Sequence, residues 1–135
     1  MKVILLATLA VTLLTAAAAA GSPTLADREA ELANTANAER GQMLYESRCF
    51  ACHSLDADRV GPHHRGVYGR PAGSVEGYAY STALKRSDIV WNVETLDAWL
   101  TNPQALIPGQ KMNFRVASPA DRLDIIAYLK QESGG

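Results

Sequence analysis

Two cysteines and a histidine within a short stretch constrain this chain more than any other feature of its sequence. Residues Cys49, Cys52 and His53 form a Cys-x-x-Cys-His pattern, which is typical of covalent c-type haem attachment. Because residues i and i+3 lie on the same side of a helical turn, each thiol can add to one vinyl group of the same haem. The imidazole that follows can then bind the iron as an axial ligand.

The same residues are compatible with other chemistry. A buried disulfide or a redox-active Cys-x-x-Cys pair would use only the two thiols of Cys49 and Cys52. A zinc site would need further donors, and the adjacent His63 and His64 are candidates for them. The rest of the chain has to distinguish these possibilities from haem attachment.

Residues 1–20 have the parts of a secretory signal peptide. A positive charge at Lys2 precedes a largely apolar run over residues 3–14 and small residues over 16–20. We expect cleavage near Ala20 and a periplasmic location. An uncleaved anchor is the alternative, since the apolar run approaches the roughly 17 residues that span a bilayer. Exported cysteines would ordinarily pair, and haem attachment, which also occurs outside the cytoplasm, gives them a different role.

Length and charge narrow the class of protein further. The chain has 135 residues and is 47% hydrophobic, which is enough for one domain with one modest core. Its 13 basic and 14 acidic residues give a formal net charge of −1. That balance argues against nucleic acid as a partner, because such proteins usually carry a basic patch.

We predict a domain over residues 37–135, preceded by an extension over 21–36 that is either a tether or a frayed helix. Three helices are expected in the domain, each with a capping residue. The first begins at Asn37 and runs to about Arg48, and the second follows Asn92. The third and clearest is capped by Ser118, with proline in its first position.

Between the first two helices, residues 54–92 are rich in glycine and proline and show no sustained periodicity. A long irregular segment is unusual in a small domain unless something else organises it. A bound haem is one such organiser, because its faces can replace missing secondary structure.

A haem held by one histidine has a sixth coordination position. Met112 lies in a loop bent by proline and glycine, Ile107-Pro108-Gly109-Gln110-Lys111-Met112, and its thioether could fill that position. The commoner role of methionine is to fill gaps in a core. From the residues alone, His63 and His64 remain competing ligands.

Taken in order, many segments of this chain resemble the class I c-type cytochromes, the group of mitochondrial cytochrome c and its bacterial periplasmic relatives. The resemblance extends from Gly41 to Lys130. It is carried by Cys49-Phe50-Ala51-Cys52-His53, Val60-Gly61-Pro62, Arg65-Gly66-Val67-Tyr68-Gly69-Arg70, Gly77-Tyr78-Ala79-Tyr80-Ser81, Ile89-Val90-Trp91, Thr95-Leu96, Leu100, Asn102-Pro103, the loop ending at Met112, and Ile125-Ile126-Ala127-Tyr128-Leu129-Lys130.

This resemblance implies that Met112 is the second axial ligand, opposite His53. It also implies that the carbonyl of Pro62 accepts a hydrogen bond from the other ring nitrogen of His53, which would fix the ring. Phe114 matches an aromatic residue at the haem edge.

Arg70, Tyr80 and Trp91 match positions that hydrogen-bond the haem propionates. Buried carboxylates need donors, and guanidinium, phenol and indole groups all supply them. The alternative is an exposed arginine and two packing aromatics.

Three positions depart from the family pattern near the haem. Trp99 stands where tyrosine is frequent beside the methionine sulfur, and indole can donate a hydrogen bond but cannot accept one. Leu84 replaces a frequent asparagine. His64 stands where an aliphatic residue usually packs on the His53 side, so it is not expected to replace Met112.

The resemblance implies an all-α, small cytochrome c fold. Its N- and C-terminal helices cross where Gly41 and Tyr45 meet Tyr128, and a short middle helix and long loops wrap around one covalent haem c.

The function that follows is that of a soluble, monomeric one-electron carrier and not an enzyme. Its expected redox partners are respiratory or photosynthetic, for example a cytochrome bc-type complex and a terminal oxidase, reductase or reaction centre. The alternative is a peroxidase-like enzyme in which Met112 leaves the iron. A gas-binding bundle cytochrome is disfavoured, because that group carries its motif near the C-terminus.

Overall fold

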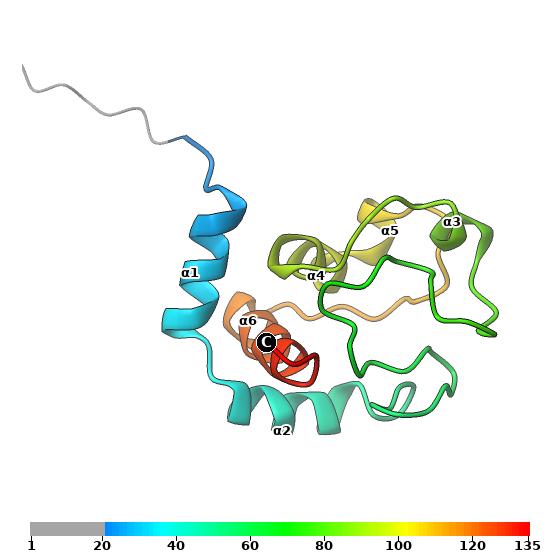
Figure 1. Cartoon of the computed structure of the whole chain (residues 1–135), viewed down its shortest axis with the longest axis horizontal. Coiled ribbons are helices and arrows are strands. Elements are labelled where there is room, and N and C mark those ends of the chain that lie inside the picture. Colours follow the sequence, from blue (N-terminus) through cyan, green and yellow to red (C-terminus); the bar gives the residue numbers. More distant parts are fainter. Residues whose placement is uncertain (1–20) are drawn as a thin grey trace, which may run out of the picture.

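Helices and long loops make up residues 21–135, the part of the chain described by the computed structural model. The helices are α1 (Leu25–Thr35), α2 (Ala38–Arg48), α3 (Thr82–Lys85), α4 (Val93–Thr101), α5 (Pro103–Leu106) and α6 (Pro119–Gln131) (Figure 1). No strand occurs in the described range, where Pro71 and Val90 form only an isolated bridge. The expected all-α fold is confirmed.

The predicted caps are present in the structure. The side chain of Asn37 accepts the backbone N–H of Arg40 at the start of α2, and that of Ser118 accepts the N–H of Asp121 at the start of α6. Asn92 forms a reciprocal capping box with Thr95 at the start of α4. Each cap satisfies an amide that has no partner within its helix. The single-turn helices α3 and α5 were not predicted.

The crossing of α2 and α6 organises the core. Figure 1 shows α6 almost end-on beside α2. At the crossing, a β-carbon on Gly41 would overlap the backbone carbonyl of Asp124, so only glycine allows this approach. Tyr45 and Tyr128 pack with their ring centroids 5.4 Å apart. These contacts confirm the predicted crossing.

Charged groups hold the same pair of helices together around their apolar contact. Arg40 forms ion pairs with both Asp121 and Asp124, and Arg48 reaches Asp121 at 2.9 Å. The pKa of Asp121 is lowered by the hydrogen bond from Arg40, which outweighs the opposing effect of burial. The ion pairs therefore favour the ionised carboxylate.

Replacing Gly41 with alanine is expected to destabilise the protein by about 2 kcal/mol. Overpacking against a backbone group costs about 1–3 kcal/mol, and here the obstacle is a carbonyl that cannot rotate away. The better helix propensity of alanine returns about 1 kcal/mol at most. Urea unfolding of the holoprotein measures the change, and Gln42→Ala on the exposed side of α2 is the control. Equal stability of the two variants would contradict the close approach.

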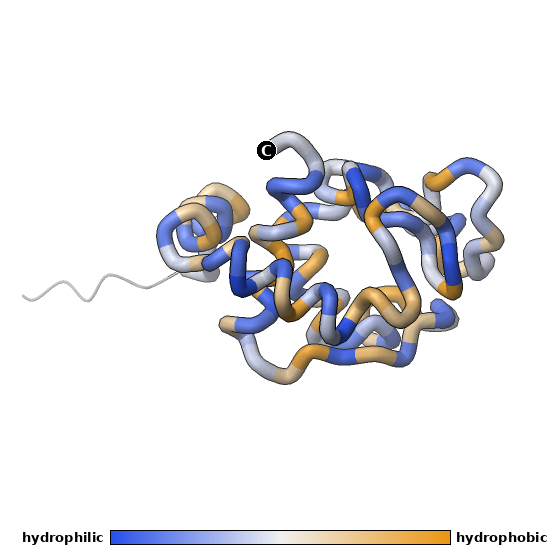
Figure 2. Tube along the Cα trace, turned by 90° about the horizontal axis from the view of Figure 1, so that it is seen from below, coloured by the Kyte–Doolittle hydropathy of each residue, from blue (hydrophilic) through white to orange (hydrophobic). Residues whose placement is uncertain are grey.

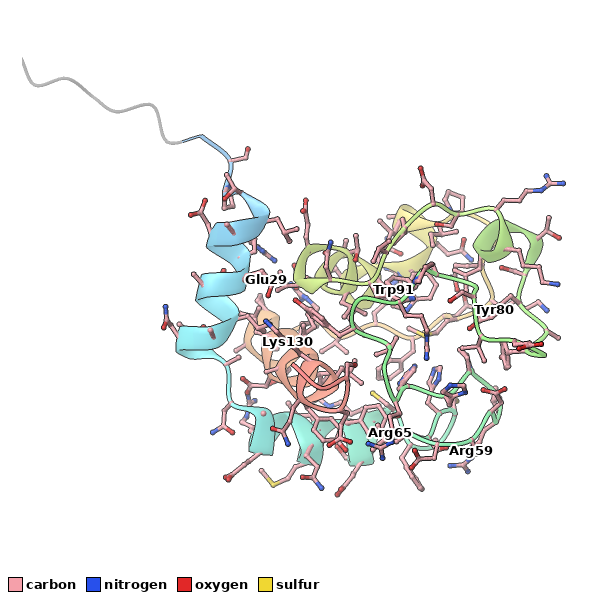
Figure 3. All side chains as sticks on the ribbon, in the orientation of Figure 1. Glu29, Arg59, Arg65, Tyr80, Trp91 and Lys130 are labelled. Atoms are coloured by element: carbon pink, nitrogen blue, oxygen red, sulfur yellow. The ribbon has the colours of Figure 1, made fainter. Side chains whose placement is uncertain are left out.

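The extension is an ordered helix and not a tether. Thr24 and Asp27 form a capping box at the start of α1, and Leu32 is only 3% exposed. Glu29 accepts a hydrogen bond from the Lys130 ammonium at 2.8 Å and another from the Tyr68 hydroxyl (Figure 3). The helix therefore packs onto the domain.

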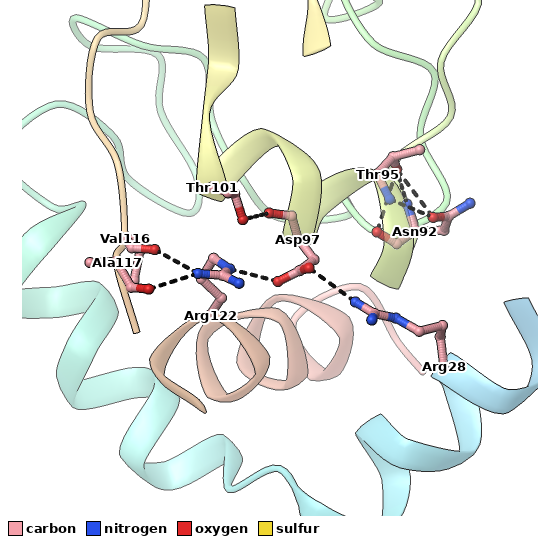
Figure 4. Close-up of polar contacts among 8 residues, drawn as sticks. All are labelled: Arg28, Asn92, Thr95, Asp97, Thr101, Val116, Ala117 and Arg122. Atoms are coloured by element: carbon pink, nitrogen blue, oxygen red, sulfur yellow. Dashed lines mark hydrogen bonds and ion pairs between the residues drawn. The ribbon is translucent and has the colours of Figure 1, made fainter. Parts of the chain in front are cut away.

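A second network of hydrogen bonds joins α1 to α4 and α6. Arg28 bonds Asp97 of α4 at 3.0 Å, and Asp97 also accepts from Arg122 of α6. Arg122 in turn donates to the carbonyls of Val116 and Ala117 (Figure 4). These contacts connect α1 to the segment that leads from Met112 into α6.

Replacing Glu29 with glutamine is expected to lower the free energy of unfolding by about 1 kcal/mol at neutral pH. Burial opposes ionisation of Glu29, but hydrogen bonds from Lys130 and Tyr68 outweigh it and lower its pKa from the ordinary 4.5. The stabilisation is therefore present above that value and is lost as the pH falls through the lower, folded-state pKa. Urea unfolding at several pH values tests this, with exposed Glu31→Gln as the control. A difference that persists in acid would contradict the assignment.

The signal-peptide prediction concerns residues 1–20, which lie outside the described residues. Within residues 21–135, no helix has the length and apolar character needed to cross a membrane.

Candidate functional site

A cavity of about 650 Å³ occupies the space between α4, α6, the end of α2 and the long loops. Figure 2 traces the chain in a second view and gives the hydropathy of each residue along it. Its volume falls within the roughly 300–1,000 Å³ that is common for cofactor sites. The valine and leucine side chains that line it are Val60, Val67, Leu84, Leu96, Leu100 and Leu129.

The Cys-x-x-Cys-His segment continues the end of α2 into this cavity. The backbone amides of Cys52 and His53 both donate to the carbonyl of Cys49, at 3.0 and 2.9 Å. Both thiols are unpaired and line the cavity. Burial raises the pKa of the Cys49 thiol to about 11, so this thiol is protonated at neutral pH. The turn gives both sulfurs access to one ligand, as the motif predicted.

His53 is held in a form that can bind a metal. Its Nδ1 lies 2.8 Å from the carbonyl of Pro62, and since a carbonyl only accepts, Nδ1 carries the proton and Nε2 keeps its lone pair. Burial lowers the pKa of His53, which favours the neutral imidazole. A side chain on Gly61 would overlap the ring, which explains the glycine beside Pro62.

The neighbouring histidines take different positions. His63 lies toward solvent, where both its backbone N–H and its Nδ1 contact Asp58, at 2.8 and 2.9 Å. His64 lines the cavity and stacks on His53, with centroids 4.0 Å apart and planes 23° apart. Burial lowers the pKa of His64 well below its usual range. His64 thus lies on the His53 side, as the resemblance implied.

Met112 reaches the same cavity from the loop after α5. Buried Gln110 holds this loop, since its side-chain amide donates to the carbonyl of Met112 at 2.7 Å and its oxygen accepts the N–H of Met112. Gln104 bonds the carbonyl of Gln110 at 3.2 Å and the N–H of Gly109 at 3.1 Å. Sequence reasoning missed both glutamines. Gln110 is buried in a loop, where a polar residue gives no signal of burial, and Gln104 is an exposed residue of the short helix α5.

Arg70, Tyr80 and Trp91 all line the cavity. Figure 3 labels Tyr80 and Trp91 among the side chains of this part of the molecule. The Arg70 guanidinium donates to the carbonyl of His63 at 2.7 Å, and burial lowers its pKa. A partly buried guanidinium beside an apolar cavity is suited to an anionic group. The structure therefore brings together the three predicted propionate donors.

Aromatic side chains complete the walls. Trp99 is buried and packs against Trp91 with centroids 5.3 Å apart. Phe114 lies at the rim and is 42% exposed. Tyr78, which was not singled out from the sequence, packs on Tyr80 at 4.7 Å and also lines the cavity.

The residues present fit a covalently attached haem. An apolar cavity of sufficient size is surrounded by two unpaired thiols, a histidine with its Nδ1 already bonded, a thioether and a partly buried arginine. The zinc alternative requires grouped donors, and among residues 21–135 no three His, Cys, Asp or Glu side chains are grouped to hold a metal ion. Fold and site together define an all-α protein that attaches one haem.

Comparisons with known proteins agree with this class. The pattern of the family described as cytochrome c matches residues 38–133. Cytochrome c of Euglena viridis is 50% identical over 97 residues, which cover 70% of this chain and 95% of that protein. The "cytochrome c-type cyt cy" of Rhodobacter capsulatus is 44% identical over 70% of this chain and 49% of its own length.

A solved structure, cytochrome cH from Methylobacterium extorquens, is also similar. It superposes with a TM-score of 0.67 at 40% identity and covers 70% of this chain and 98% of its own. The chain belongs to the cytochrome c family. Members of this family are electron carriers with one covalently attached haem c, and Cys49 and Cys52 fit its attachment motif.

Proposed function

We propose that this protein is a one-electron carrier whose haem iron is bound axially by His53 and Met112. The observation that carries the proposal is that both side chains line one cavity, although they come from separate segments. With both axial positions filled by the protein, no position is open to a substrate, so the protein transfers electrons and does not act as an enzyme.

Each group around the cavity has a distinct task. Cys49 and Cys52 would form thioether bonds to the haem, and Arg70, Tyr80 and Trp91 would donate hydrogen bonds to its propionates. When bound, the haem supplies an iron that exchanges one electron. The thioether of Met112 raises the reduction potential, and the apolar walls raise it further. The indole N–H of Trp99 can donate a hydrogen bond near the Met112 sulfur but cannot accept one.

Electrons are proposed to enter and leave at the edge of the cavity where Cys49 and Cys52 lie. Cys52 is exposed there, and Phe114 lies at the cavity rim. Phe50 and Val60, which flank the same edge, are 51% and 76% exposed. This apolar surface is suited to brief contact with a redox partner.

The rate of electron transfer to a partner is expected to depend only weakly on ionic strength. Apart from Lys2, the chain has only Lys85, Lys111 and Lys130, with nine arginines, and many of these arginines form ion pairs within the protein. Stopped-flow measurements at increasing salt concentrations test this. A steep fall in rate would instead indicate electrostatic steering.

The proposed setting is the periplasm, after cleavage near residue 20. There a monomer would shuttle between a donor such as a cytochrome bc-type complex and a terminal oxidase, reductase or reaction centre. The signal-peptide pattern of residues 1–20 supports export. N-terminal sequencing of the exported protein tests the cleavage, and an intact N-terminus would favour an anchored form.

A redox titration followed by visible spectroscopy tests the central proposal. The protein is exported from a host that attaches haem, and the ferric form is examined at neutral pH for the far-red methionine–iron charge-transfer band. We expect a reversible one-electron transition with the band present. Absence of the band, together with turnover of peroxide, would favour the peroxidase-like alternative.

A further inference from the structure

His64 stacks directly on the ring of the proposed ligand His53. The two rings lie nearly parallel, 23° apart, with centroids separated by 4.0 Å. His64 is itself fixed by Tyr45, whose ring meets it edge-on at 5.7 Å and is only 2% exposed. The backbone N–H of His64 also donates to the carbonyl of Ser54 at 2.9 Å. A rigidly held ring thus covers one face of His53.

This contact adds a restraint that the other neighbours of His53 do not supply. The hydrogen bond from Nδ1 to Pro62 fixes the direction of one ring atom, and Gly61 approaches the edge that carries Cε1. A single hydrogen bond still allows the ring plane to rock about it. A flat ring in face-to-face contact opposes that rocking, because tilting His53 would push it into His64.

A histidine at position 64 carries a free-energy cost, because one of its ring nitrogens is buried and unpaired within residues 21–135. Its Nδ1 is buried without a hydrogen-bond partner among the described residues, and an unsatisfied buried polar atom costs about 1–3 kcal/mol. An aliphatic side chain at this position would avoid that cost. It would also lack a flat face and a ring dipole.

We propose that His64 is a positioning residue that sets the plane of the His53 imidazole and adds polarity beside it. The inference rests on the proposed function, in which His53 binds the haem iron. Two effects follow. The orientation of the axial imidazole governs the magnetic anisotropy of low-spin ferric iron, and a polar ring near the iron favours the more highly charged ferric state.

Variants at position 64 separate these two effects. His64→Leu removes both the flat face and the polarity, whereas His64→Phe keeps a flat ring and removes only the polarity. His63→Leu is the matched control, since it is the adjacent residue of the same type and its side chain contacts Asp58 and not His53. Each exported holoprotein is examined by low-temperature electron paramagnetic resonance in the ferric state and by redox titration.

We expect His64→Leu to shift and broaden the largest g value, and His64→Phe to restore a sharp signal close to that of the wild type. The midpoint potential should rise in both variants, and His63→Leu should leave both quantities unchanged. If His64→Leu keeps the wild-type g values and potential, the positioning role is wrong. If His63→Leu changes them equally, the effect is not specific to the stack.

Failure of this inference is distinguishable from failure of the proposed function. A wild-type protein that carries no covalent haem, or whose ferric haem lacks a low-spin signal, would overturn the ligand assignment itself. A normal wild-type signal that is insensitive to position 64 would overturn only the role of His64. If His64→Leu does not accumulate as holoprotein, the comparison of His64→Phe with the wild type still decides whether the potential rises.

Discussion

Replacing Cys49 and Cys52 together with serine is expected to abolish covalent haem attachment. A serine hydroxyl does not form a thioether, and the two thiols at the end of α2 line the haem cavity. A haem stain after denaturing electrophoresis should fall to background. The variant should also lose thermal stability, because an apolar cavity of about 650 Å³ would then lack a covalently held occupant.

Single variants act as internal controls for this experiment. Cys52→Ser alone leaves the thiol of Cys49, so a weaker but detectable stain is expected from one remaining bond. Conversion of the exposed Ser47 to alanine, on the last turn of α2, should leave the stain unchanged. A stain that survives in the double variant would show that the haem is attached elsewhere, and the assignment of both cysteines would be wrong.

Replacing Met112 with alanine is expected to open the sixth coordination position. The far-red band of the ferric protein should disappear, and the midpoint potential should fall by on the order of 100 mV, within the roughly 0.8 V over which axial ligands set haem potentials. Peroxide turnover should rise, because a small ligand can then reach the iron. Spectroscopy, redox titration and a peroxidase assay measure the three effects.

Met43 provides the matched control. It is 63% exposed on α2 and does not line the cavity, so Met43→Ala should retain the band and the potential. Retention of the band in Met112→Ala would mean that a different methionine binds the iron, and the assignment of Met112 would be wrong. Replacement of Met112 by a histidine would not preserve the band, and the cavity-lining His64 stacks on the His53 side.

The ordered α1 adds a feature outside the part of the chain that matches the family, which begins at residue 38. Its Glu29 bonds Tyr68 in the long loop, and its Arg28 contacts Asp97 of α4. Tyr68 adjoins the cavity-lining Val67. The helix therefore stabilises the domain through contacts with the long loop, α4 and α6, and none of its residues lines the cavity.

Several elements could be predicted from the sequence because their causes are local. The caps at Asn37, Asn92 and Ser118 depend on side chains that bond amides three positions away. The attachment motif is equally local, since its residues share one helical turn. The resemblance to a known family supplied the pairing of His53 with Met112, which local reasoning had left open.

Other features could not be predicted from the sequence, because a largely polar segment gives little indication that it packs against the rest of the protein. Leu25 and Leu32 are the only large apolar residues of the segment over residues 21–36, so its helix depends on contacts of Leu32, Arg28 and Glu29 with distant elements. The burial of Gln110, which holds the Met112 loop, could not be predicted for the same reason. Helix propensity depends on the residues of the segment itself, whereas burial depends on which other segments pack against it.

What the sequence determined by itself was the chemistry available: two thiols and an imidazole on one turn, a thioether on a bent loop, and three capped helices. Only the tertiary structure decided which groups meet. It stacks His64 on His53, brings Gly61 against the same ring, and encloses one cavity between segments far apart in the chain. The physical reason is that packing places side chains by shape and contact in three dimensions, and a linear pattern does not encode those distances directly.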